Sequence, residues 1–505
     1  DVCEGCGDCG VQSNCVSIVP FETELGRKRA IDQSSCNKDY SCVKGFCPSF
    51  VTIEGAKVRK SASVSLDIGD LAEPVVPGIA GATHNIVIAG VGGAGVITIG
   101  AVLAMAAHLE GKGASMMEMA GLAQKGGAVH VHCRLGKTPG DISSVRVSVG
   151  ECDTLIGGDL VVSAGAKTIG LMATGRTKAV VNAHEIVTGE FTRNTEFRIP
   201  SEDLTMSLKA RVQDNLTLFD VTKLSEVVMG DAIYGNMILL GASWQKGHVP
   251  LGRAAIEEAI ALNGAAVEDN LRAFQVGRWL AENTEAAEGV ITSDVVAKPK
   301  SLKEKIDFCA EHLTDYQSAR LAARYRRLVD KVEGDDLKGA VAKGYHKLLA
   351  YKDEYEVARL LSATRSKAEA AFEGDLKLTY NLAPPLLSRK GPDGRPLKRA
   401  FGAWVERLWP HLAKLKRLRG TPFDPFGYTA ERRMERRLIK EYERDIKAML
   451  KTPPANHAAA LALAELPLKI RGFGPVKLKN AQDAEKTRET LKAALNTAPR
   501  SEDAA

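Results

Sequence analysis

The sequence predicts an α/β protein in three parts: a small cysteine-rich module at 1–60, a layered α/β domain at 84–285 and a mainly helical region at 300–505. Three observations predict this organisation. Seven of the ten cysteines lie within the first fifty residues. The middle of the chain alternates apolar runs of strand length with helical stretches, and the last part is charged and periodic with few strand signals.

Composition limits the class of protein. With 505 residues, of which 45% are hydrophobic and 26% charged, the chain has room for several domains and the composition of a soluble globular protein. Its formal net charge of +6 is too small to indicate a nucleic-acid partner, and it suits docking to an acidic protein. The chain contains neither an apolar run of membrane-spanning length nor a signal peptide. We therefore expect a cytoplasmic protein with no membrane partner.

The cysteines of the first module follow a regular spacing. In order they are Cys3, Cys6, Cys9, Cys15, Cys36, Cys42 and Cys47. The spacing C-x2-C-x2-C with a distant Cys-Pro is that of bacterial ferredoxins, in which the Cys-Pro thiolate ligates the cluster of the other motif. This pattern predicts a ferredoxin-like module in which one [4Fe–4S] cluster is held by four thiolates, those of Cys3, Cys6, Cys9 and Cys47.

The second half of the module is less regular. Cys36 and Cys42 have the ferredoxin spacing, but Asp39 stands where the middle cysteine would be. With Cys15 as a distant ligand, the sequence leaves open a second cluster that includes the carboxylate, a three-iron cluster, or no second cluster. Two other interpretations compete. A zinc site would leave three cysteines over, and a disulfide framework is typical of small secreted domains with an even number of cysteines.

The second part follows a linker predicted at 61–83, where prolines and glycines interrupt regular structure. A continuous apolar run at 85–89 predicts a buried strand, and an apolar, alanine-rich stretch at 96–109 predicts a helix. Between them lies a G-x-G-x-x-G loop that contains Gly90, Gly92, Gly93 and Gly95. Strand, glycine loop and helix in this order can bind a phosphate group, because the glycines allow close backbone approach and the helix N-terminus attracts anions.

A dinucleotide site also needs an acidic residue about twenty positions further on, at the end of the next strand. Neither Glu110, at a helix end, nor Glu118, within a strand, meets this requirement. A purely structural glycine turn is therefore favoured. A methionine-rich strand at 116–119 then leads into a polar loop, and a strand follows at 128–135. That loop could contact an anionic group at a domain interface through Gln124, Lys125, Gly126 and Gly127.

The remaining elements of the two larger parts follow from local patterns. Further strands are predicted at 144–149, 154–156, 179–182 and 216–220, and helices at 224–230, 236–243, 253–262 and 267–283. In the third part, several helices are predicted across 302–371, followed by helices at 400–419, 431–449 and 456–466 and a polar tail from Lys486. No catalytic constellation is apparent in this third part.

The order of the parts resembles the 2-oxoacid:ferredoxin oxidoreductases, most closely the indolepyruvate ferredoxin oxidoreductases in their long fused form. The resemblance rests on the module CEGCGDCGVQSNC…SSCNKDYSCVKGFCPSF and on HNIVIAGVGGAGVITIG with the downstream GLAQKGG, which is similar to the Rossmann-like gamma-type domain of that family. It also rests on the order of these two parts. It covers about residues 1–285, and the helical region looks like the extra C-terminal region of fused members.

The resemblance implies a thiamine-diphosphate enzyme that decarboxylates an aryl 2-oxoacid such as indolepyruvate, forms an acyl-CoA from coenzyme A, and passes electrons through the cluster to ferredoxin. This chain contains no G-D-G motif with a following Asn-Asn pair, the usual magnesium and diphosphate signature. Thiamine diphosphate and Mg are therefore expected in partner domains or a partner subunit. The chain would be the C-terminal, electron-transfer portion of the fused form, within an oligomer, and its glycine loops would be structural or face those domains.

Two alternatives remain from the sequence. One is a stand-alone iron–sulfur electron-transfer module that binds ferredoxin without substrate chemistry. The other is a nucleotide-dependent oxidoreductase that uses the loop at 90–95 for NAD or FAD. The sequence does not identify the residues that would carry out catalysis, either in a thiamine-dependent enzyme or in a nucleotide-dependent one.

Overall fold

The computed structural model describes residues 2–33, 35–59, 66–120, 127–186, 191, 194, 196–292, 301–384, 388–389, 391 and 395–497. The chain divides into two compact units. Unit 1 combines Asp1–Arg59 with Ala297–Ala505, and unit 2 is Lys60–Val296. Among the described residues, none of the helices combines the length and the hydrophobicity that a bilayer crossing requires.

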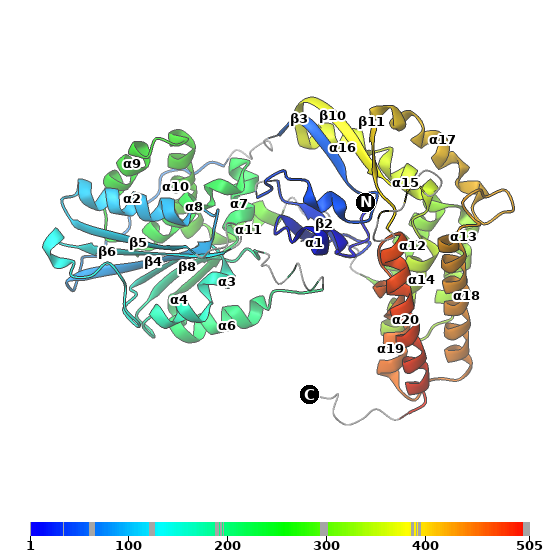
Figure 1. Ribbon diagram of the computed structural model, residues 1–505. Helices are drawn as coiled ribbons and strands as arrows, with labels where there is room; N and C mark the ends of the chain where they lie inside the picture. Colours follow the sequence, from blue (N-terminus) through cyan, green and yellow to red (C-terminus); the bar gives the residue numbers. More distant parts are fainter. Residues whose placement is uncertain are drawn as a thin grey trace. The chain divides into compact units, whose positions relative to one another are not determined.

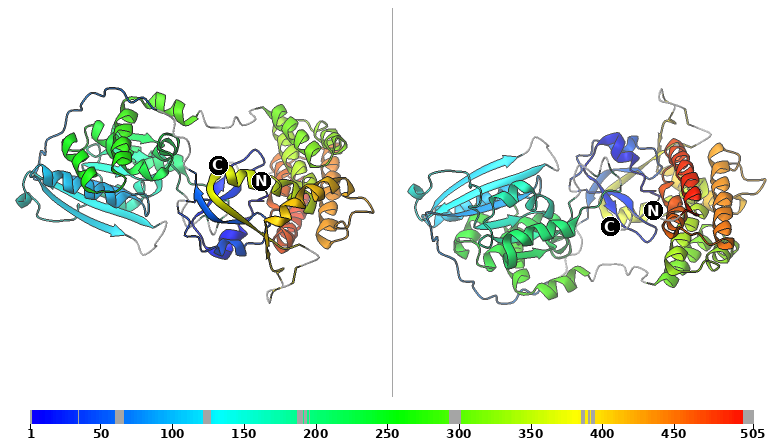
Figure 2. Two further views of the ribbon diagram at one scale, coloured as in Figure 1. Left: turned by 90° about the horizontal axis from the view of Figure 1, so that it is seen from above. Right: turned by 90° about the horizontal axis from the view of Figure 1, so that it is seen from below.

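Unit 1 corrects the predicted division into three separate parts. The cysteine module and the C-terminal region share a three-stranded antiparallel sheet of order β11-β10-β3 (Figures 1 and 2). In this sheet β3 (Val51–Val58) pairs with β10 (Phe372–Leu382), which in turn pairs with β11 (Arg399–Gly402). Because the partner of a strand can lie hundreds of residues away, local patterns did not reveal this pairing.

The rest of unit 1 is helical, as predicted for the C-terminal region, with a small module at its N-terminal end. The module contains α1 (Asp8–Ser13), the hairpin β1 (Ile18–Phe21) and β2 (Lys28–Ile31), and the 3-10 helix η1 (Ser41–Lys44). The C-terminal helices are α12 (Leu302–Tyr316), α13 (Ala319–Val329), α14 (Asp335–Leu349), α15 (Glu354–Leu361), α16 (Thr364–Ala371), α17 (Trp409–Lys414), α18 (Ala430–Lys451), α19 (His457–Glu465) and α20 (Gly474–Ala494).

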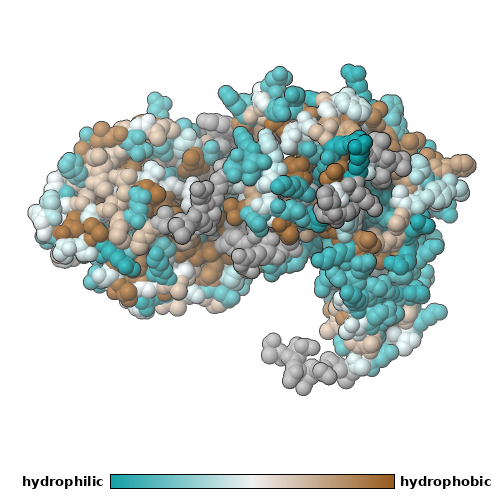
Figure 3. Space-filling model, in the orientation of Figure 1, coloured by the Kyte–Doolittle hydropathy of each residue, from teal (hydrophilic) through white to brown (hydrophobic). Residues whose placement is uncertain are grey.

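Two apolar cores hold unit 1 together. The first lies among α12, α13, α14, α18, α19 and α20, and includes Tyr325, Tyr345 and Tyr442, whose rings stack in succession. The second joins the module to β10 and α17, and includes Val2, Tyr380 and Trp409. The outer faces of α18 and α20 are hydrophilic (Figure 3), and the opposite face of α18 buries Met434, Leu438 and Tyr442.

Unit 2 is a layered α/β domain, as predicted. Its six-stranded sheet has the order β5-β6-β4-β7-β8-β9. The strands are β4 (Thr83–Val91), β5 (Gly113–Ala120), β6 (Ala128–Gly136), β7 (Thr154–Gly157), β8 (Lys178–Asn182) and β9 (Leu216–Phe219). β4, β7, β8 and β9 are mutually parallel, but β6 runs antiparallel to both of its neighbours. The sheet therefore differs from an all-parallel doubly wound sheet at one edge.

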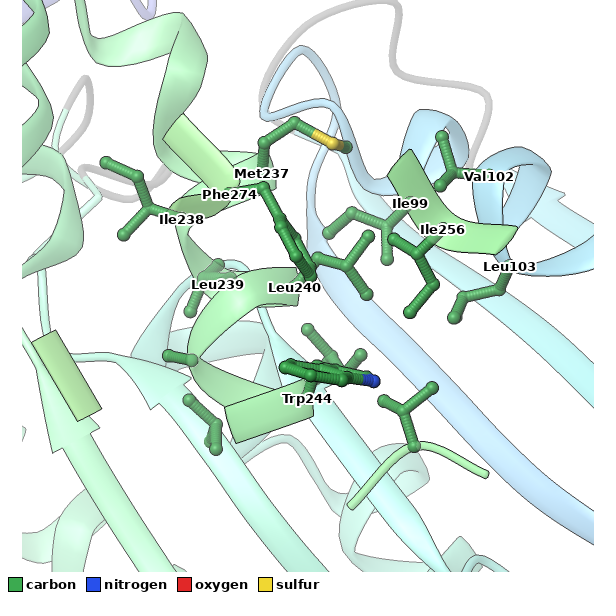
Figure 4. Packing of buried hydrophobic residues seen from close by; sticks show 14 of the residues in the cluster. Ile99, Val102, Leu103, Met237, Ile238, Leu239, Leu240, Trp244, Ile256 and Phe274 are labelled. Atoms are coloured by element: carbon green, nitrogen blue, oxygen red, sulfur yellow. The ribbon is translucent and has the colours of Figure 1, made fainter. Parts of the chain in front are cut away.

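Helices cover both faces of this sheet (Figure 1). They are α2 (Val96–Leu109), α3 (Leu160–Ser163), α4 (Ala166–Leu171), α6 (Ser201–Val212), α7 (Val221–Met229), α8 (Gly235–Gln245), α9 (Arg253–Leu262), α10 (Val267–Glu282) and α11 (Thr284–Thr292). Successive residues of β4 point to opposite faces. Ile86 and Ile88 join the core under α2, α8 and α10, whereas Val87 and Ala89 join the core under α3, α4 and α6. Figure 4 shows part of the first core, with Ile99, Trp244 and Phe274 among the labelled side chains.

The predicted linker is partly built into unit 2. Leu66, Ile68 and Leu71 pack against the larger core. The buried Arg278 guanidinium donates hydrogen bonds to the carbonyl oxygens of Leu71 and Ala72, each at 3.4 Å, and its Nε donates to Gln245 Oε1 at 2.9 Å. The described part of this segment is therefore fixed to the domain by side-chain contacts.

Three local predictions are wrong. The stretch 144–149 is not a strand, because Val147 N donates to the His132 ring at 2.9 Å instead of joining a ladder. The expected helix at 400–419 is a strand end, two 3-10 turns and the short α17. The expected polar tail from Lys486 is instead part of α20, whose residues Ala481 and Ala484 are buried in the helical core.

Candidate functional site

The cysteine module is shaped by tight backbone turns. Gly5 lies between Cys3 and Cys6 with a left-handed φ of 67°, and a Cβ added there would lie 2.2 Å from the carbonyl oxygen of Arg27. Only glycine fits such an approach without displacement of the backbone. Cys9 then lies in α1, against Gly45, where a Cβ would come within 2.7 Å of Cys9 Cα. The first cysteine loop and the segment before Cys47 are therefore packed closely together.

Four cysteines surround a cavity of about 150 Å³. They are the four that the sequence assigns to one cluster, Cys3, Cys6, Cys9 and Cys47. The rest of the wall includes Ile18, Phe50 and Val51. Among the residues that the structure describes, no three His, Cys, Asp or Glu side chains converge on a point as the ligands of a single metal ion would. The thiols instead line a space with room for a larger group, and their chemistry suits iron.

Burial and the charges of neighbouring thiolates both affect the pKa values of these cysteines. Burial, with smaller contributions from the charges of Cys47 and Cys3, raises the pKa of Cys6 and of Cys9 to about 12. Burial also raises the pKa of Cys47. These raised pKa values favour the protonated thiols. A coordinated metal would favour the thiolates instead, because metal-bound thiols are deprotonated outright. The neutral form of these groups is thus the stable one only in the absence of a cation.

The other three module cysteines form a second group. Burial raises the pKa of Cys42 to about 11, and the charges of Cys15 and Cys36 contribute to the rise. Asp39 also acts on Cys42, but its Oδ1 accepts hydrogen bonds from the backbone N (3.0 Å) and the hydroxyl (2.9 Å) of Ser41. The members of the predicted second set therefore interact electrostatically, and the carboxylate is engaged in a local turn.

Two buried acids in the first cysteine loop anchor it to the rest of unit 1. Glu4 forms ion pairs with Lys347 and, at 3.2 Å, with Lys352. Burial opposes ionisation of this carboxylate, but the lysine charges outweigh burial and lower its pKa. Asp8 accepts a hydrogen bond from Phe46 N at 2.6 Å and pairs with Arg395 at 3.3 Å.

The glycine loop of unit 2 lies at the carboxyl end of β4, and protein groups already occupy several of its amides. Val91 N donates to Asp159 Oδ2 at 2.7 Å, and Gly92 N donates to the carbonyl oxygen of Gly127 at 2.9 Å. Gly90 packs against β7, because a Cβ added there would lie 3.3 Å from Gly158 Cα. Gly95, with φ at 72°, leaves room for Asn236, whose Nδ2 would lie 2.2 Å from an added Cβ.

These contacts favour the structural interpretation of the loop. The buried Asp159 carboxylate stands where a phosphate would accept from Val91 N, and burial raises its pKa. Gly93 is different, since it is exposed and a Cβ there would meet nothing within 4 Å. Of the predicted second loop, Gly127 contacts the first, while Gln124, Lys125 and Gly126 lie outside the described residues.

Sequence reasoning missed the polar groups at the carboxyl ends of the neighbouring parallel strands. They are Asp159 after β7, Asn182 and His184 at the end of β8, and Asp220 after β9. Asn182 Nδ2 donates to Gly158 O at 3.1 Å, and its Oδ1 accepts from Val221 N at 3.0 Å. A signal was present, since each group directly follows a buried apolar run, the usual position of ligands in open α/β sheets.

His184 and Asp220 form an accessible ion pair at this edge. The His184 Nδ1 lies 3.6 Å from Asp220 Oδ1, and both side chains are 40% exposed. Burial opposes the charged imidazole, but the carboxylate outweighs it and raises the pKa of His184. By contrast, His130 and His132 of β6 are buried. Burial lowers the pKa of His132 to about 4, so that ring is neutral.

Comparisons with known proteins agree with this geometry. Residues 85–279 match the family model described as pyruvate ferredoxin/flavodoxin oxidoreductase. The indolepyruvate oxidoreductase subunit IorB of Archaeoglobus fulgidus is 27% identical over 195 residues, which are 38% of this chain and 92% of that subunit. The subunit of the same name from Pyrococcus horikoshii is 28% identical over 196 residues, 38% of this chain and 94% of its own length. Residues 85–279 are therefore similar to the pyruvate ferredoxin/flavodoxin oxidoreductase family.

The similarity to this family lies in unit 2. Solved structures that match include the gamma subunit of a keto/oxoacid ferredoxin oxidoreductase from Geobacter sulfurreducens, with 24% identity, a TM-score of 0.28, and coverage of 39% of this chain and 98% of that one. A 2-oxoglutarate:ferredoxin oxidoreductase from Magnetococcus marinus matches with 15% identity and a TM-score of 0.28, over 43% of this chain and 32% of that one. Residues 302–490, in unit 1, match a family of unknown function (DUF6537).

Proposed function

We propose that this chain is the electron-transfer and gamma-type portion of a thiamine-diphosphate-dependent 2-oxoacid:ferredoxin oxidoreductase. Its substrate class would be aryl pyruvates such as indolepyruvate, oxidatively decarboxylated to an acyl-CoA with reduction of ferredoxin. The family match of residues 85–279 and the similarity to two IorB subunits support the reaction class. Thiamine diphosphate and Mg would be bound by partner domains or a partner subunit.

The observation that carries the proposal is the cavity enclosed by four cysteines. Cys3, Cys6, Cys9 and Cys47 would hold one [4Fe–4S] cluster, which when bound supplies a carrier for single electrons. The chain's own residues would orient and shield it. The glycine turns fix the first loop, and Phe50 and Val51 contribute apolar surface that limits access of water.

A second cluster is the weaker part of the proposal. Cys15, Cys36 and Asp39 each act electrostatically on Cys42. Three thiolates and one carboxylate could complete a ligand set if Asp39 left its hydrogen bonds to Ser41. A chain with two clusters would bind about twice the iron of a chain with one.

The glycine loops would face the thiamine-binding partner rather than bind a nucleotide. The exposed Gly93 and the 40% exposed Ile97 lie beside the loop amides that Asp159 and Gly127 already engage. A bound dinucleotide would bring its pyrophosphate against the Asp159 carboxylate. The competing NAD or FAD oxidoreductase therefore receives no support from the loop contacts.

Cysteine variants of the anaerobically purified chain test the metal assignment. Cys47→Ser should lose most of the iron and acid-labile sulfide, because the cluster would lack one of its four ligands. The control is Cys309→Ser, at a half-buried cysteine of α12 outside the module, which should keep the parent's content. Equal iron in the parent and in Cys47→Ser would contradict the ligand set. A flavin spectrum in the parent would favour the alternative.

The complete enzyme, purified with its thiamine-binding partner, tests the reaction. Indolepyruvate and coenzyme A together should bleach the visible absorbance of the cluster within the dead time of a manual assay, and ferredoxin should restore it. A stand-alone electron-transfer module would show no such bleaching with any 2-oxoacid, although dithionite would still reduce it. Indolepyruvate, phenylpyruvate and pyruvate compared in turn would define the substrate class.

A further inference from the structure

The C-terminal region of unknown function reaches the cysteine module with four basic side chains. Lys347, at the end of α14, and Lys352, just beyond it, contact the first cysteine loop. Arg395 and Lys398 precede β11 and contact the module at α1 and η1. All four residues lie within 302–490, more than three hundred residues from the segments that they contact.

The two lysines next to α14 hold the start of the first loop. Lys352 Nζ donates to the carbonyl oxygen of Val2 at 2.9 Å and to that of Cys3 at 3.1 Å. The same ammonium lies 3.2 Å from the Glu4 carboxylate, which also pairs with Lys347. Glu4 is only 6% exposed and carries one negative charge against two positive ones. Two ammonium groups of the C-terminal region therefore outnumber the one Glu4 carboxylate where they contact the first cysteine loop.

The other two basic side chains hold the opposite wall. Lys398 Nζ donates to the carbonyl oxygen of Val43 at 2.9 Å, and it lies 5.0 Å from the centre of the Phe50 ring, which lines the cavity. Arg395 pairs with Asp8, whose other oxygen accepts from Phe46 N. Asp8 thereby links the first loop to the segment that carries Cys47, and a guanidinium neutralises it.

The turn that precedes α20 packs against the same cysteine module. Gly472 has φ at 101°, and a Cβ added there would lie 3.3 Å from Cys6 Cβ. At Gly474 an added Cβ would lie 2.4 Å from the ring of Phe46. The C-terminal region thus meets both cysteine segments by close packing as well as by charge.

We propose that residues 302–490 act as a cationic clamp, which holds the cysteine segments around the iron–sulfur cluster and raises its reduction potential. This inference rests on the proposed function. Four thiolates give a bound cluster a net negative charge that grows on reduction, and nearby fixed cations stabilise the reduced form more than the oxidised one. Lys347, Lys352, Arg395 and Lys398 are positioning residues that contact the ligand loops and not the iron. The family of unknown function would then be an electron-transfer accessory of this enzyme.

The test compares variants of the full chain by iron content and by EPR-monitored redox titration with dithionite. Lys352→Met should keep its iron and become harder to reduce, by at least tenfold in the equilibrium constant, or about 59 mV for one electron. Lys352→Arg, which keeps the charge, should match the parent. So should Lys377→Met in β10, whose exposed lysine pairs with Glu54 on the surface. Lys398→Met repeats the test at the opposite wall.

The outcomes separate this inference from the proposed function. A parent chain without iron would refute the proposed function itself. Iron at the parent's level and an unchanged potential in both Lys352→Met and Lys398→Met would overturn the clamp alone. If Lys352→Met loses iron and Lys352→Arg retains it, the result would support the clamp, because the positive charge would then be what holds the cysteine segments around the cluster. A purely structural lysine would lower stability without moving the potential of the iron that remains.

Discussion

Both units have apolar cores, and unit 1 adds buried ion pairs between segments that lie far apart in the sequence. Unit 2 has a continuous apolar core around α2, α8 and α10, where Gly241 and Gly277 let two helices approach until an added Cβ would lie within 2.1 Å of backbone oxygen. Unit 1 joins its distant segments through buried charges, among them Glu4 with Lys352, Asp353 with Arg419, and Glu435 with Lys477.

The kind of contact that joins the segments of a unit affects its rigidity and the charges that it holds in place. Apolar packing specifies a rigid scaffold, as befits a domain that would present loops to a partner. Buried ion pairs add little net stability compared with apolar contacts, but they fix charges in place at a defined geometry. A module that binds an anionic cluster benefits from such charges. Variants that remove one contact of each kind measure how much each kind contributes to stability.

The largest effect is expected at the Arg419–Asp353 pair of unit 1. Both side chains are 3% exposed, their atoms are 2.5 Å apart, and the guanidinium lies 3.8 Å from the Tyr316 ring centre. Arg419→Met would leave a buried carboxylate without its partner and should cost about 3–5 kcal/mol. The control, Arg326→Met, removes the exposed pair with Asp307 and should cost at most about 1 kcal/mol. Hydrogen exchange on unit 1 peptides measures both losses, and equal losses would contradict the role assigned to burial.

A smaller effect is expected at the helix contact of unit 2. Gly277→Ala places a Cβ 2.0 Å from the carbonyl oxygen of Ile238, so α8 and α10 must separate at a cost of about 3 kcal/mol. Gly289→Ala in α11 meets nothing within 4 Å and should stabilise by about 0.4–1 kcal/mol. Urea-dependent hydrogen exchange of α10 peptides measures the stability change that each of these two variants causes. Destabilisation of unit 1 by Gly277→Ala would contradict the division into separate units.

The smallest effect concerns pH and the His184–Asp220 pair. The pKa of His184 is raised, so its contribution is complete below the unfolded value near 6.5 and is lost as pH rises through the folded value. Asp220 has a lowered pKa, so its contribution is lost as pH falls through the folded value, below about 3.9. The pair should therefore stabilise unit 2 mainly between about pH 4 and 6.5, by less than about 1 kcal/mol because it is exposed.

Asp220→Asn provides the measurement. The histidine NMR titration of this variant should give a lower His184 pKa than the parent, and the stability difference from the parent should be larger at pH 5.5 than at pH 8.5. The His130 and His132 rings, buried in β6, serve as internal references that should not move. An unchanged His184 titration would show that the carboxylate is not its partner in solution.

The same contrast explains what the sequence could predict. In unit 2 the helices at 96–109 and 253–262 agree with the prediction to the residue, because apolar periodicity and flanking glycines act locally. The grouping of Cys3, Cys6, Cys9 and Cys47 around one cavity also agrees, since the ferredoxin spacing encodes it. The ligand role of these cysteines stays a prediction.

The remaining features depend on long-range contacts. The pairing of β3 with β10 and the approach of Lys352 to Cys3 join segments over three hundred residues apart, and no local signal marks them. Asp159 could have been found as a polar residue after a buried strand, but its bond to Val91 N depends on the parallel register of β4 and β7. The stretch 144–149 had a strand pattern but no adjacent strand with which to pair.

The most direct test of the account is the iron and acid-labile sulfide content of the anaerobically purified chain, with low-temperature EPR after dithionite reduction. We expect about four irons per chain if Cys3, Cys6, Cys9 and Cys47 hold one cluster. About seven or eight irons with two interacting signals would add a second cluster at Cys15, Cys36 and Cys42, with Asp39 as the candidate fourth ligand. A chain that holds zinc and no iron would contradict the electron-transfer function.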